Sequence, residues 1–352
     1  MEDHFPHMIP KHCEVCKKVD GLLRCGACKT YYYCSREHQT ADRPTHKTTC
    51  KTIKGSKEKI DEEEARLRAR AAGDDGLPPN VLEAHGGRLW LWTPARPYLH
   101  AMFVHGEMLI RSWRQQGIED ALTLYLSVLQ KNTTDNQGVR HHIPALYMRL
   151  GRNQEAYDFL KAWGLQFMGR PEASAPDDAR PAYQRLKNAH PAEEVDLWTG
   201  RFLDLPLVSS VQLVKVRLLI GLQGLLAFRK GLPHGAPVPP ARDILADVRG
   251  KCCDDIFDRM PEEYADVDLI TKKCDDINRQ LNELFVAVGK YNKHFWPMML
   301  HPEERDFSTR SHGFLHGSRE EAHLAFTCTY SAWCETPMAL QTVRASFAAG
   351  EE

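Results

Sequence analysis

The feature that most constrains this chain is a cluster of cysteine and histidine residues near its N-terminus. Of the 11 cysteines in the 352 residues, six fall between Cys13 and Cys50. With two histidines they form four closely spaced pairs, which supply eight candidate metal ligands: Cys13, Cys16, Cys25, Cys28, Cys34, His38, His46 and Cys50. Eight ligands fill two tetrahedral zinc sites and leave no open position, which is the pattern of structural zinc. The sequence therefore predicts two bound Zn²⁺ ions.

Each pair has a spacing that suits a shared metal ion. In the two C-x2-C pairs a tight turn directs both sulfurs to one metal, and a glycine in the second pair suits such a turn. Cys34 and His38 are four residues apart. His46 and Cys50 have the same separation, which on a helix places both side chains of a pair on one face. Ser35 is positioned to cap the helix that carries His38.

The distribution of cysteine also indicates a redox compartment. A secreted disulfide scaffold is short and rich in cysteine throughout, whereas here the other five cysteines are scattered among helical patterns. The first residues lack the apolar stretch of a secretory signal. We expect reduced thiolates that bind metal, and an intracellular location in the nucleus or the cytoplasm.

The cluster and the residues around it resemble a MYND zinc finger. The resemblance is carried by Leu23, Cys25, Cys28, Tyr33, Cys34, Ser35, Gln39, Asp42, His46, Lys47 and Cys50. It implies a cross-brace of two sites, with the following ligands: Cys13, Cys16, Cys34 and His38 on one zinc, and Cys25, Cys28, His46 and Cys50 on the other. Spacing alone leaves two sequential sites open as an alternative.

Two positions depart from the family pattern. His38 stands where the sixth ligand is usually cysteine, and imidazole also binds zinc well. Arg43 follows Asp42 where the family usually has tryptophan. In the family that tryptophan and the residue matching Gln39 help to form a groove for short proline-containing peptides. The resemblance implies protein partners, with proline-containing peptides among them, but with Arg43 the aromatic side of that groove is lost.

Charge disfavours nucleic acid as the partner. The whole chain has 46 Lys and Arg residues against 47 Asp and Glu residues. Residues 1–54 carry ten basic and six acidic residues. Each zinc with three thiolates and a neutral histidine contributes a charge of −1, so the finger has a net charge of about +2. Phosphate binding needs several converging cations, so we expect a protein-binding module.

Beyond the cluster the chain reads as helix, so the expected fold class is mainly α. The charge-rich stretch Lys57–Ala72 places acidic residues before basic ones, which complements the dipole of a helix. Glycines and prolines follow and end that helix. We expect three parts: a MYND finger over residues 1–54, a helical linker over 55–87 and an α-helical domain over 88–352.

Helical patterns recur along the third part. Apolar residues three and four apart predict an amphipathic helix over residues 118–129. Asp135 is placed to cap a further helix that Gly151 ends, and Pro144 should kink or split it. With the helix that follows, this segment resembles tetratricopeptide-like repeats. Residues 88–348 resemble the helical region that follows MYND fingers in fungal proteins, which implies a helical fold and no particular activity.

The C-terminal part has its own helix signals. An apolar stripe over residues 270–291 predicts one long helix, and we favour core packing over a coiled-coil dimer because the pattern ends near Lys293. Ser318 with Glu321 forms a capping box, and Thr336 before a proline is placed to cap a last helix.

The most apolar stretch is expected to be a buried helix. Residues 205–228 include Lys215 and Arg217, which are costly at the centre of a bilayer. We therefore expect no membrane partner.

The expected function is that of an adaptor without catalytic activity, in which the finger and the helical domain both serve as docking surfaces. The sequence has no G-x-S-x-G, G-x-x-x-x-G-K-[ST] or G-x-G-x-x-G motif. MYND fingers also occur in SET-domain lysine methyltransferases, whose Asn-His-Ser-Cys-type cofactor motif and late cysteine-rich zinc site are not found in this chain. The alternative is a methyltransferase-like or other enzyme with an unrecognised site in the helical region.

Overall fold

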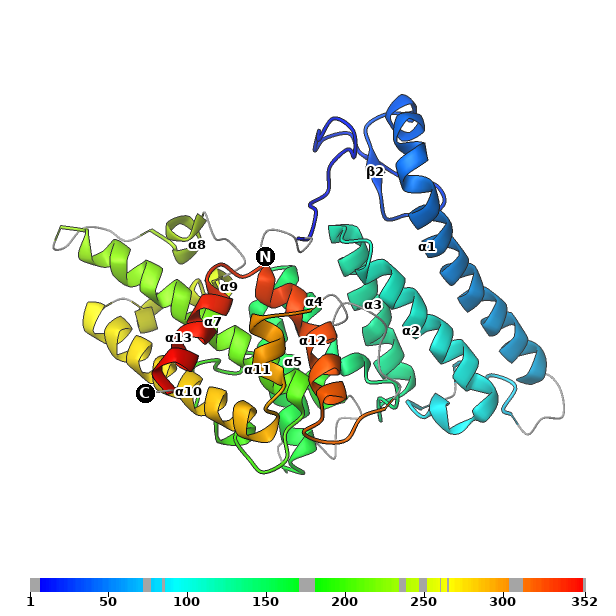
Figure 1. Ribbon diagram of the computed structural model, residues 1–352. Helices are drawn as coiled ribbons and strands as arrows, with labels where there is room; N and C mark the ends of the chain where they lie inside the picture. The colour runs from blue at the N-terminus through cyan, green and yellow to red at the C-terminus, as the bar shows by residue number, and fades with distance from the viewer. Residues whose placement is uncertain are drawn as a thin grey trace. The chain divides into compact units, whose positions relative to one another are not determined.

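The structure is a computed structural model in which the chain forms two compact units, Pro6–Leu146 and Tyr147–Glu352. The residues that it describes are 7–71, 77–83, 86–170, 181–233, 239–246, 252–259, 261–264, 266–303 and 313–350. Almost all regular structure in both is helical, so the expected mainly α fold class is confirmed (Figure 1).

The first unit consists of a small hairpin and three main helices. The hairpin pairs β1 (Leu23–Arg24) with β2 (Tyr32–Tyr33) in antiparallel register. The helices and short 3-10 turns follow in this order: α1 (Arg36–Ala71), η2 (Leu89–Leu91), η3 (Thr93–Ala95), α2 (Arg96–Ile110), α3 (Gln115–Lys131) and η4 (Val139–His141). Helix α4 (Ile143–Arg149) runs across the boundary between the two units.

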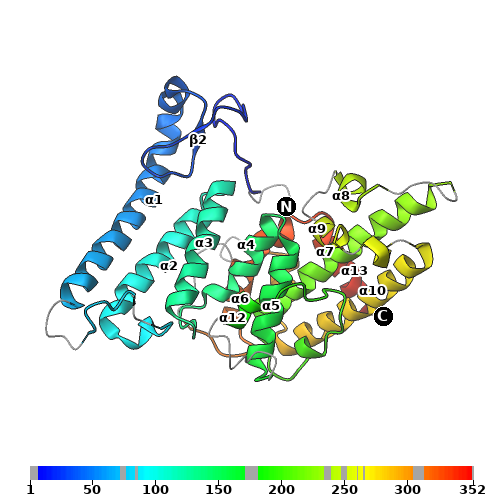
Figure 2. The same ribbon diagram turned by 180° about the vertical axis from the view of Figure 1, so that it is seen from behind.

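Helix α1 begins inside the zinc-ligand segment and continues far beyond it. Ser35 Oγ accepts the His38 amide at 3.3 Å, which caps the helix as expected. Ile53, Ile60 and Leu67 are buried on one side of α1, which packs along α2 (Figure 2). The expected boundary at residue 54 therefore falls within one continuous helix. The division into a finger over residues 1–54, a linker over 55–87 and a helical domain over 88–352 stays a prediction.

The short elements between α3 and the second unit follow the expected signals. Asp135 accepts the amides of Val139 and Arg140 at 2.9 and 3.0 Å, so it caps the 3-10 turn η4 rather than an α-helix. Pro144 lies in the first turn of α4, which separates that helix from η4. Gly151 follows the end of α4 with φ +72°, a conformation that favours glycine.

The second unit is built around α7 (Leu205–Lys230). Helices α5, α10 and α12 pack directly on it. The elements of this unit are α5 (Asn153–Phe167), α6 (Ala182–Arg185), η6 (Asp196–Trp198), α7, α8 (Ala241–Ile244), α9 (Asp254–Phe257), η8 (Pro261–Tyr264), α10 (Val267–Tyr291), α11 (Phe295–Leu300), α12 (Arg319–Cys334) and α13 (Ala339–Gly350). The apolar stripe of α10 faces α7, which confirms the expected core packing.

Helix α7 is a core helix with two buried cations. Its length and mean hydropathy of 1.6 would suit a membrane span, yet 94% of its apolar window is buried inside the protein. Lys215 Nζ donates to two backbone carbonyls and to Gln280 Oε1 at 2.6–3.0 Å. Arg217 Nη1 donates to the Met148 carbonyl and to Asn153 Oδ1 at 2.7 and 2.8 Å. These hydrogen bonds replace the water that burial removes from both charges.

The two capping signals near the C-terminus have different outcomes. Ser318 Oγ accepts the Glu321 amide at 3.2 Å at the start of α12, as expected. The expected cap at Thr336 is wrong. Its hydroxyl donates to the Ala332 carbonyl at 2.7 Å and accepts Arg217 Nε at 2.9 Å, so it closes the end of α12 instead.

The contact between α1 and α2 predicts a pH dependence of stability. His105 on α2 is buried, and its Nδ1 lies 2.8 Å from Ser56 Oγ on α1. Burial lowers the His105 pKa from 6.5 to about 4. Between these values the unfolded chain binds a proton that the folded chain does not. The free energy of unfolding should therefore fall by up to about 3 kcal/mol as the pH drops from 6.5 to 4.

Urea denaturation across this pH range measures the effect as the difference between two variants, because zinc release at low pH contributes to both. His105→Gln should flatten the slope, whereas His100→Gln, at an exposed position of the same helix, should leave it unchanged. Equal slopes in both variants would contradict the assignment to His105.

Candidate metal centre

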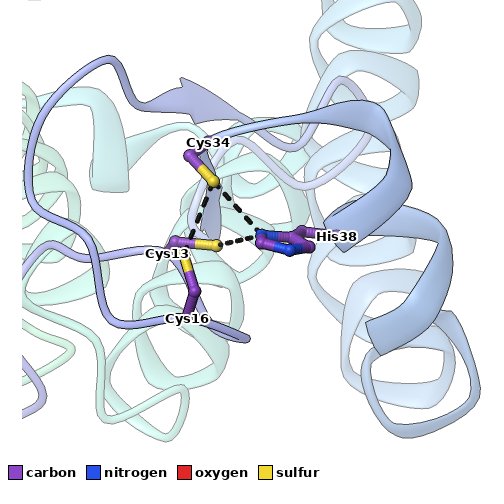
Figure 3. Close-up of side chains that lie close together, drawn as sticks. All are labelled: Cys13, Cys16, Cys34 and His38. Carbon is purple, nitrogen blue, oxygen red and sulfur yellow. Dashed lines mark hydrogen bonds between the residues drawn. The ribbon is translucent and has the colours of Figure 1, made fainter.

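The first ligand cluster joins one C-x2-C pair to the start of α1. Cys13, Cys16, Cys34 and His38 place their ligand atoms within 4.8 Å of one another. His38 Nδ1 lies 3.4 Å from Cys13 Sγ and 3.2 Å from Cys34 Sγ, and the sulfurs of Cys16 and Cys34 are 3.5 Å apart (Figure 3).

The second cluster is buried in full. It contains Cys25, Cys28, His46 and Cys50, again within 4.8 Å of one another. The sulfurs of Cys25 and Cys50 are 3.7 Å apart, and Cys28 Sγ lies 3.5 Å from His46 Nε2. His46 and Cys50 lie on successive turns of α1, so both side chains are on the same face of the helix, as their spacing predicts.

The two clusters are interleaved along the chain. The first C-x2-C pair meets the ligands that follow β2, and the second pair meets the ligands further along α1. The cross-brace is therefore confirmed, and two sequential sites are excluded. A tetrahedral zinc with Zn–S bonds of about 2.3 Å and a Zn–N bond of about 2.0 Å separates its ligand atoms by roughly 3.5–3.8 Å. The observed separations of 3.2–3.7 Å fit two Zn²⁺ ions, each held by three sulfurs and one nitrogen.

Electrostatics around the ligands differs between the two sites. Burial raises the pKa of the Cys13 thiol, but hydrogen bonds from the amides of Cys16, Cys34 and Val15 outweigh it and lower the pKa to about 6. Burial raises the pKa of Cys28 to about 12 and lowers that of His46. A neutral imidazole is the form that binds metal, and a bound zinc ion deprotonates its thiols.

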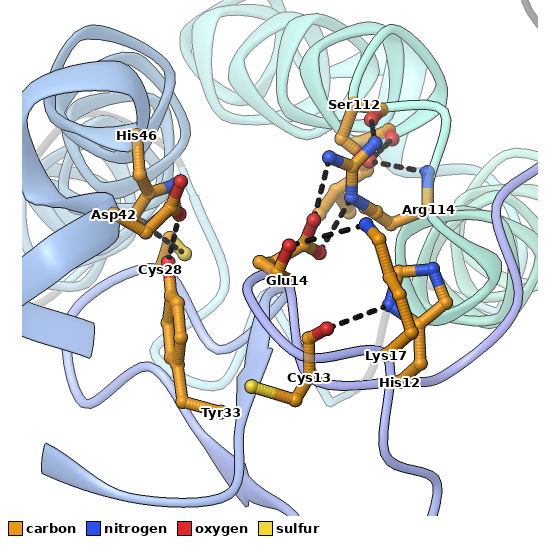
Figure 4. A network of polar contacts seen from close by, with 11 residues as sticks. His12, Cys13, Glu14, Lys17, Cys28, Tyr33, Asp42, His46, Ser112 and Arg114 are labelled. Atoms are coloured by element: carbon orange, nitrogen blue, oxygen red, sulfur yellow. Dashed lines mark hydrogen bonds and ion pairs between the residues drawn. The ribbon is translucent and has the colours of Figure 1, made fainter. Parts of the chain in front are cut away.

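A neighbouring pair supports the second cluster. Tyr33 OH donates to Asp42 Oδ2 on α1 at 2.7 Å, which ties β2 to the helix that carries His46 (Figure 4). The ring centroids of Tyr31 and Tyr33 lie 4.1 and 6.1 Å from that of His46, so both rings pack around the imidazole.

The finger is also attached to the turn between α2 and α3 through Arg114. Its guanidinium forms two hydrogen bonds with the Glu14 carboxylate, at 2.7 and 2.9 Å (Figure 4). It also lies 4.5 Å from the Tyr31 ring centroid. The side chains of Arg114 and Glu14 are only 19% and 8% exposed. A bidentate pair with little exposure is stronger than an ordinary surface ion pair.

Further contacts surround this pair. The Ile9 amide donates to the Trp113 carbonyl at 2.8 Å, and the Gln115 amide donates back to the Ile9 carbonyl at 2.9 Å. Gln116 Oε1 accepts both Tyr32 OH at 2.6 Å and Arg24 Nη2 at 2.9 Å. This attachment could not be predicted from the sequence, because its partners lie about a hundred residues apart and belong to no motif.

Comparison with known families agrees with this geometry. The MYND finger family model matches residues 13–50, from the first ligand to the last. This segment is a MYND zinc finger, a module that mediates protein–protein interactions.

Curated relatives match over the same part of the chain. Mouse Egl nine homolog 1 is 48% identical over 40 residues, which is 11% of this chain and 10% of that protein. Human N-lysine methyltransferase SMYD2 is 48% identical over 40 residues, which is 11% of this chain and 9% of that protein. The chain thus matches about a tenth of the length of these relatives. No solved structure matches it.

The clusters predict the metal content of the intact protein. Purified full-length chain should contain two zinc ions, because each cluster offers four protein ligands. Cys16→Ser and Cys25→Ser should each lower the content toward one, whereas Cys274→Ser on α10 should leave it at two. Elemental analysis by mass spectrometry measures this directly. A single zinc ion in the wild-type chain would contradict the two-site assignment.

The attachment through Arg114 predicts a local stability effect. Arg114→Ala leaves the shielded Glu14 carboxylate without its partner, which should cost about 1–3 kcal/mol. Arg111→Ala is the matched control, since Arg111 is 60% exposed and lies 3.7 Å from Glu107. It should cost less than about 0.5 kcal/mol. Hydrogen exchange should rise over residues 7–34 in the first variant alone, and equal exchange in both variants would refute a holding role for Arg114.

Proposed function

We propose that this protein is a zinc-dependent adaptor that binds other proteins and has no catalytic activity of its own. The observation that carries the proposal is the MYND finger with two complete ligand sets. Four protein ligands on each ion leave no coordination position for a substrate, so the metal would hold a binding surface in shape. Zinc binding requires reduced thiolates, which supports an intracellular location in the nucleus or the cytoplasm as part of this proposal.

The contacts within the first unit indicate which face of the finger is available. Glu14, Tyr31 and Tyr32 are engaged by the turn between α2 and α3. The first turns of α1, with half-buried Gln39 and exposed Arg43, are not covered in this way. A protein partner would therefore dock along the start of α1. Proline-containing peptides remain candidate ligands because Gln39 is present. Arg43, however, replaces the tryptophan that lines the peptide groove in the family.

The second unit is proposed as a further docking surface. It holds a shallow cavity of about 160 Å³ between α5 and α6, which is lined by Ala162, Leu165, Ala182, Arg185 and Leu186. A cavity of this size suits one side chain of a partner rather than a whole small-molecule substrate.

An enzymatic function is the second candidate. Its support is the similarity to N-lysine methyltransferase SMYD2, which covers the finger alone. Since the shared segment is a binding module, that similarity favours shared partner recognition over shared chemistry.

Affinity capture with the tagged full-length chain tests the adaptor. Cys25→Ala removes one ligand of the buried site and should abolish capture of partners that need the finger. Cys334→Ala, a cysteine of α12 outside both clusters, should retain every partner. Zinc content and circular dichroism of both variants provide the folding control. If every partner survives in Cys25→Ala, the finger is only a structural element and the proposal is wrong.

A further inference from the structure

One face of α1 carries a row of cations. Its members are Arg36, Arg43, Lys47, Lys51 and Lys54, all exposed. Their separations of seven, four, four and three residues keep them within about 80° of the helix circumference. The row, called the basic stripe below, spans 19 residues, or about 27 Å.

The zinc sites determine where this stripe points. His46 and Cys50 direct their side chains into the second cluster, and Ile53 continues the same buried side toward α2. The stripe lies on the exposed surface next to this buried side. Metal binding thus fixes the rotation of α1 about its axis and presents the cations to solvent.

The charge of the stripe is left largely uncompensated. Among the residues that the structure describes, Lys54 is the one member with an ion pair, to Glu58 at 3.2 Å. The C-terminal half of α1 is different, because its cations are paired within the helix. These pairs are Lys57 with Asp61, Lys59 with Glu62 and Glu63, Arg66 with Glu62 and Glu63, and Arg68 with Glu64. One helix therefore carries a neutral exposed half and a positive exposed half.

The surroundings of the stripe favour an acidic protein segment over nucleic acid. Single-stranded nucleic acid is held by cations together with aromatic side chains on which bases stack. Tyr31 and Tyr33 of the finger are buried, and Tyr32 is bonded to Gln116. The net charge of the finger, about +2, is also small for phosphate binding. The basic stripe is a single row of cations, so its charges are complementary to a peptide that carries regularly spaced carboxylates along one side.

We propose that the basic stripe is the docking surface for an acidic segment of a partner protein. Glutamate or aspartate at intervals of three or four residues on a partner helix would face the cations turn by turn. The inference rests on the proposed adaptor function and specifies the chemistry of the partner. Arg43, which stands where the family usually has tryptophan, lies between Arg36 and Lys47 in the part of the stripe that belongs to the finger.

Fluorescence anisotropy with defined probes tests this proposal on the zinc-loaded, full-length protein. The probe is a labelled helical peptide with glutamate at every third or fourth position, and its glutamine counterpart is the uncharged control. The variant R43E/K47E/K51E reverses three charges of the stripe. The matched control K272E/K290E/K293E makes the same net charge change at exposed lysines on and just after α10. Both should hold two zinc ions.

The stripe variant should weaken binding of the acidic peptide at least about tenfold near 50 mM salt, and the control variant should leave it within about twofold. R43Q/K47Q/K51Q should have an intermediate effect. Equal affinity of the wild type and the stripe variant would overturn the proposal. So would tighter, stripe-dependent binding of a single-stranded oligonucleotide of equal charge, which would make the stripe a nucleic-acid surface.

Failure of the stripe and failure of the adaptor are distinguishable. Partners that are lost in Cys25→Ala but retained in the stripe variant would leave the adaptor standing and refute the stripe. Partners that survive in Cys25→Ala would refute the adaptor, whatever the anisotropy measurement shows.

Discussion

Tetrahedral coordination across interleaved ligand pairs is the constraint on which the first unit depends. A segment of 38 residues, matched from first ligand to last, has too little apolar surface to fold by burial alone. Two metal ions replace that missing core, and interleaving means that neither site closes without bringing distant parts of the segment together. Because His38, His46 and Cys50 belong to α1, the same coordination also sets the direction and the rotation of a 36-residue helix.

Arg114 extends this constraint from the finger to the helices. Its bidentate pair with Glu14 and its contact with Tyr31 lie against the turn where α2 meets α3. The backbone exchange between Ile9 and that turn adds a second attachment just before the first ligand. The finger is thus held at both of its ends, by the N-terminal segment on the turn and by α1 on α2. These contacts do not involve the first turns of α1, where we propose that a partner docks.

The parts of the structure that follow from local spacing could be predicted from the sequence, and those that follow from distant contacts could not. Ligand identity, the cap at Ser35 and the core side of α10 depend on residues within a few turns of one another. The cap at Thr336 failed because Arg217, 119 residues away, binds its hydroxyl. The continuity of α1 was missed although Ile53, Ile60 and Leu67 repeat every seven residues, since charged residues surround them.

The sharing of α1 between metal sites and helix packing restricts how this part of the chain can vary in length. Cys50 must face the second cluster while Ile53, three residues later, faces α2. One residue inserted between them would turn everything beyond it by about 100°, which would expose the apolar side and bury charged side chains. Only insertions or deletions near whole multiples of a helical turn, such as about seven or eleven residues, keep Cys50 facing the metal and Ile53 facing α2. The helix thus couples metal coordination to hydrophobic packing, because both depend on the angular positions of residues around the same axis.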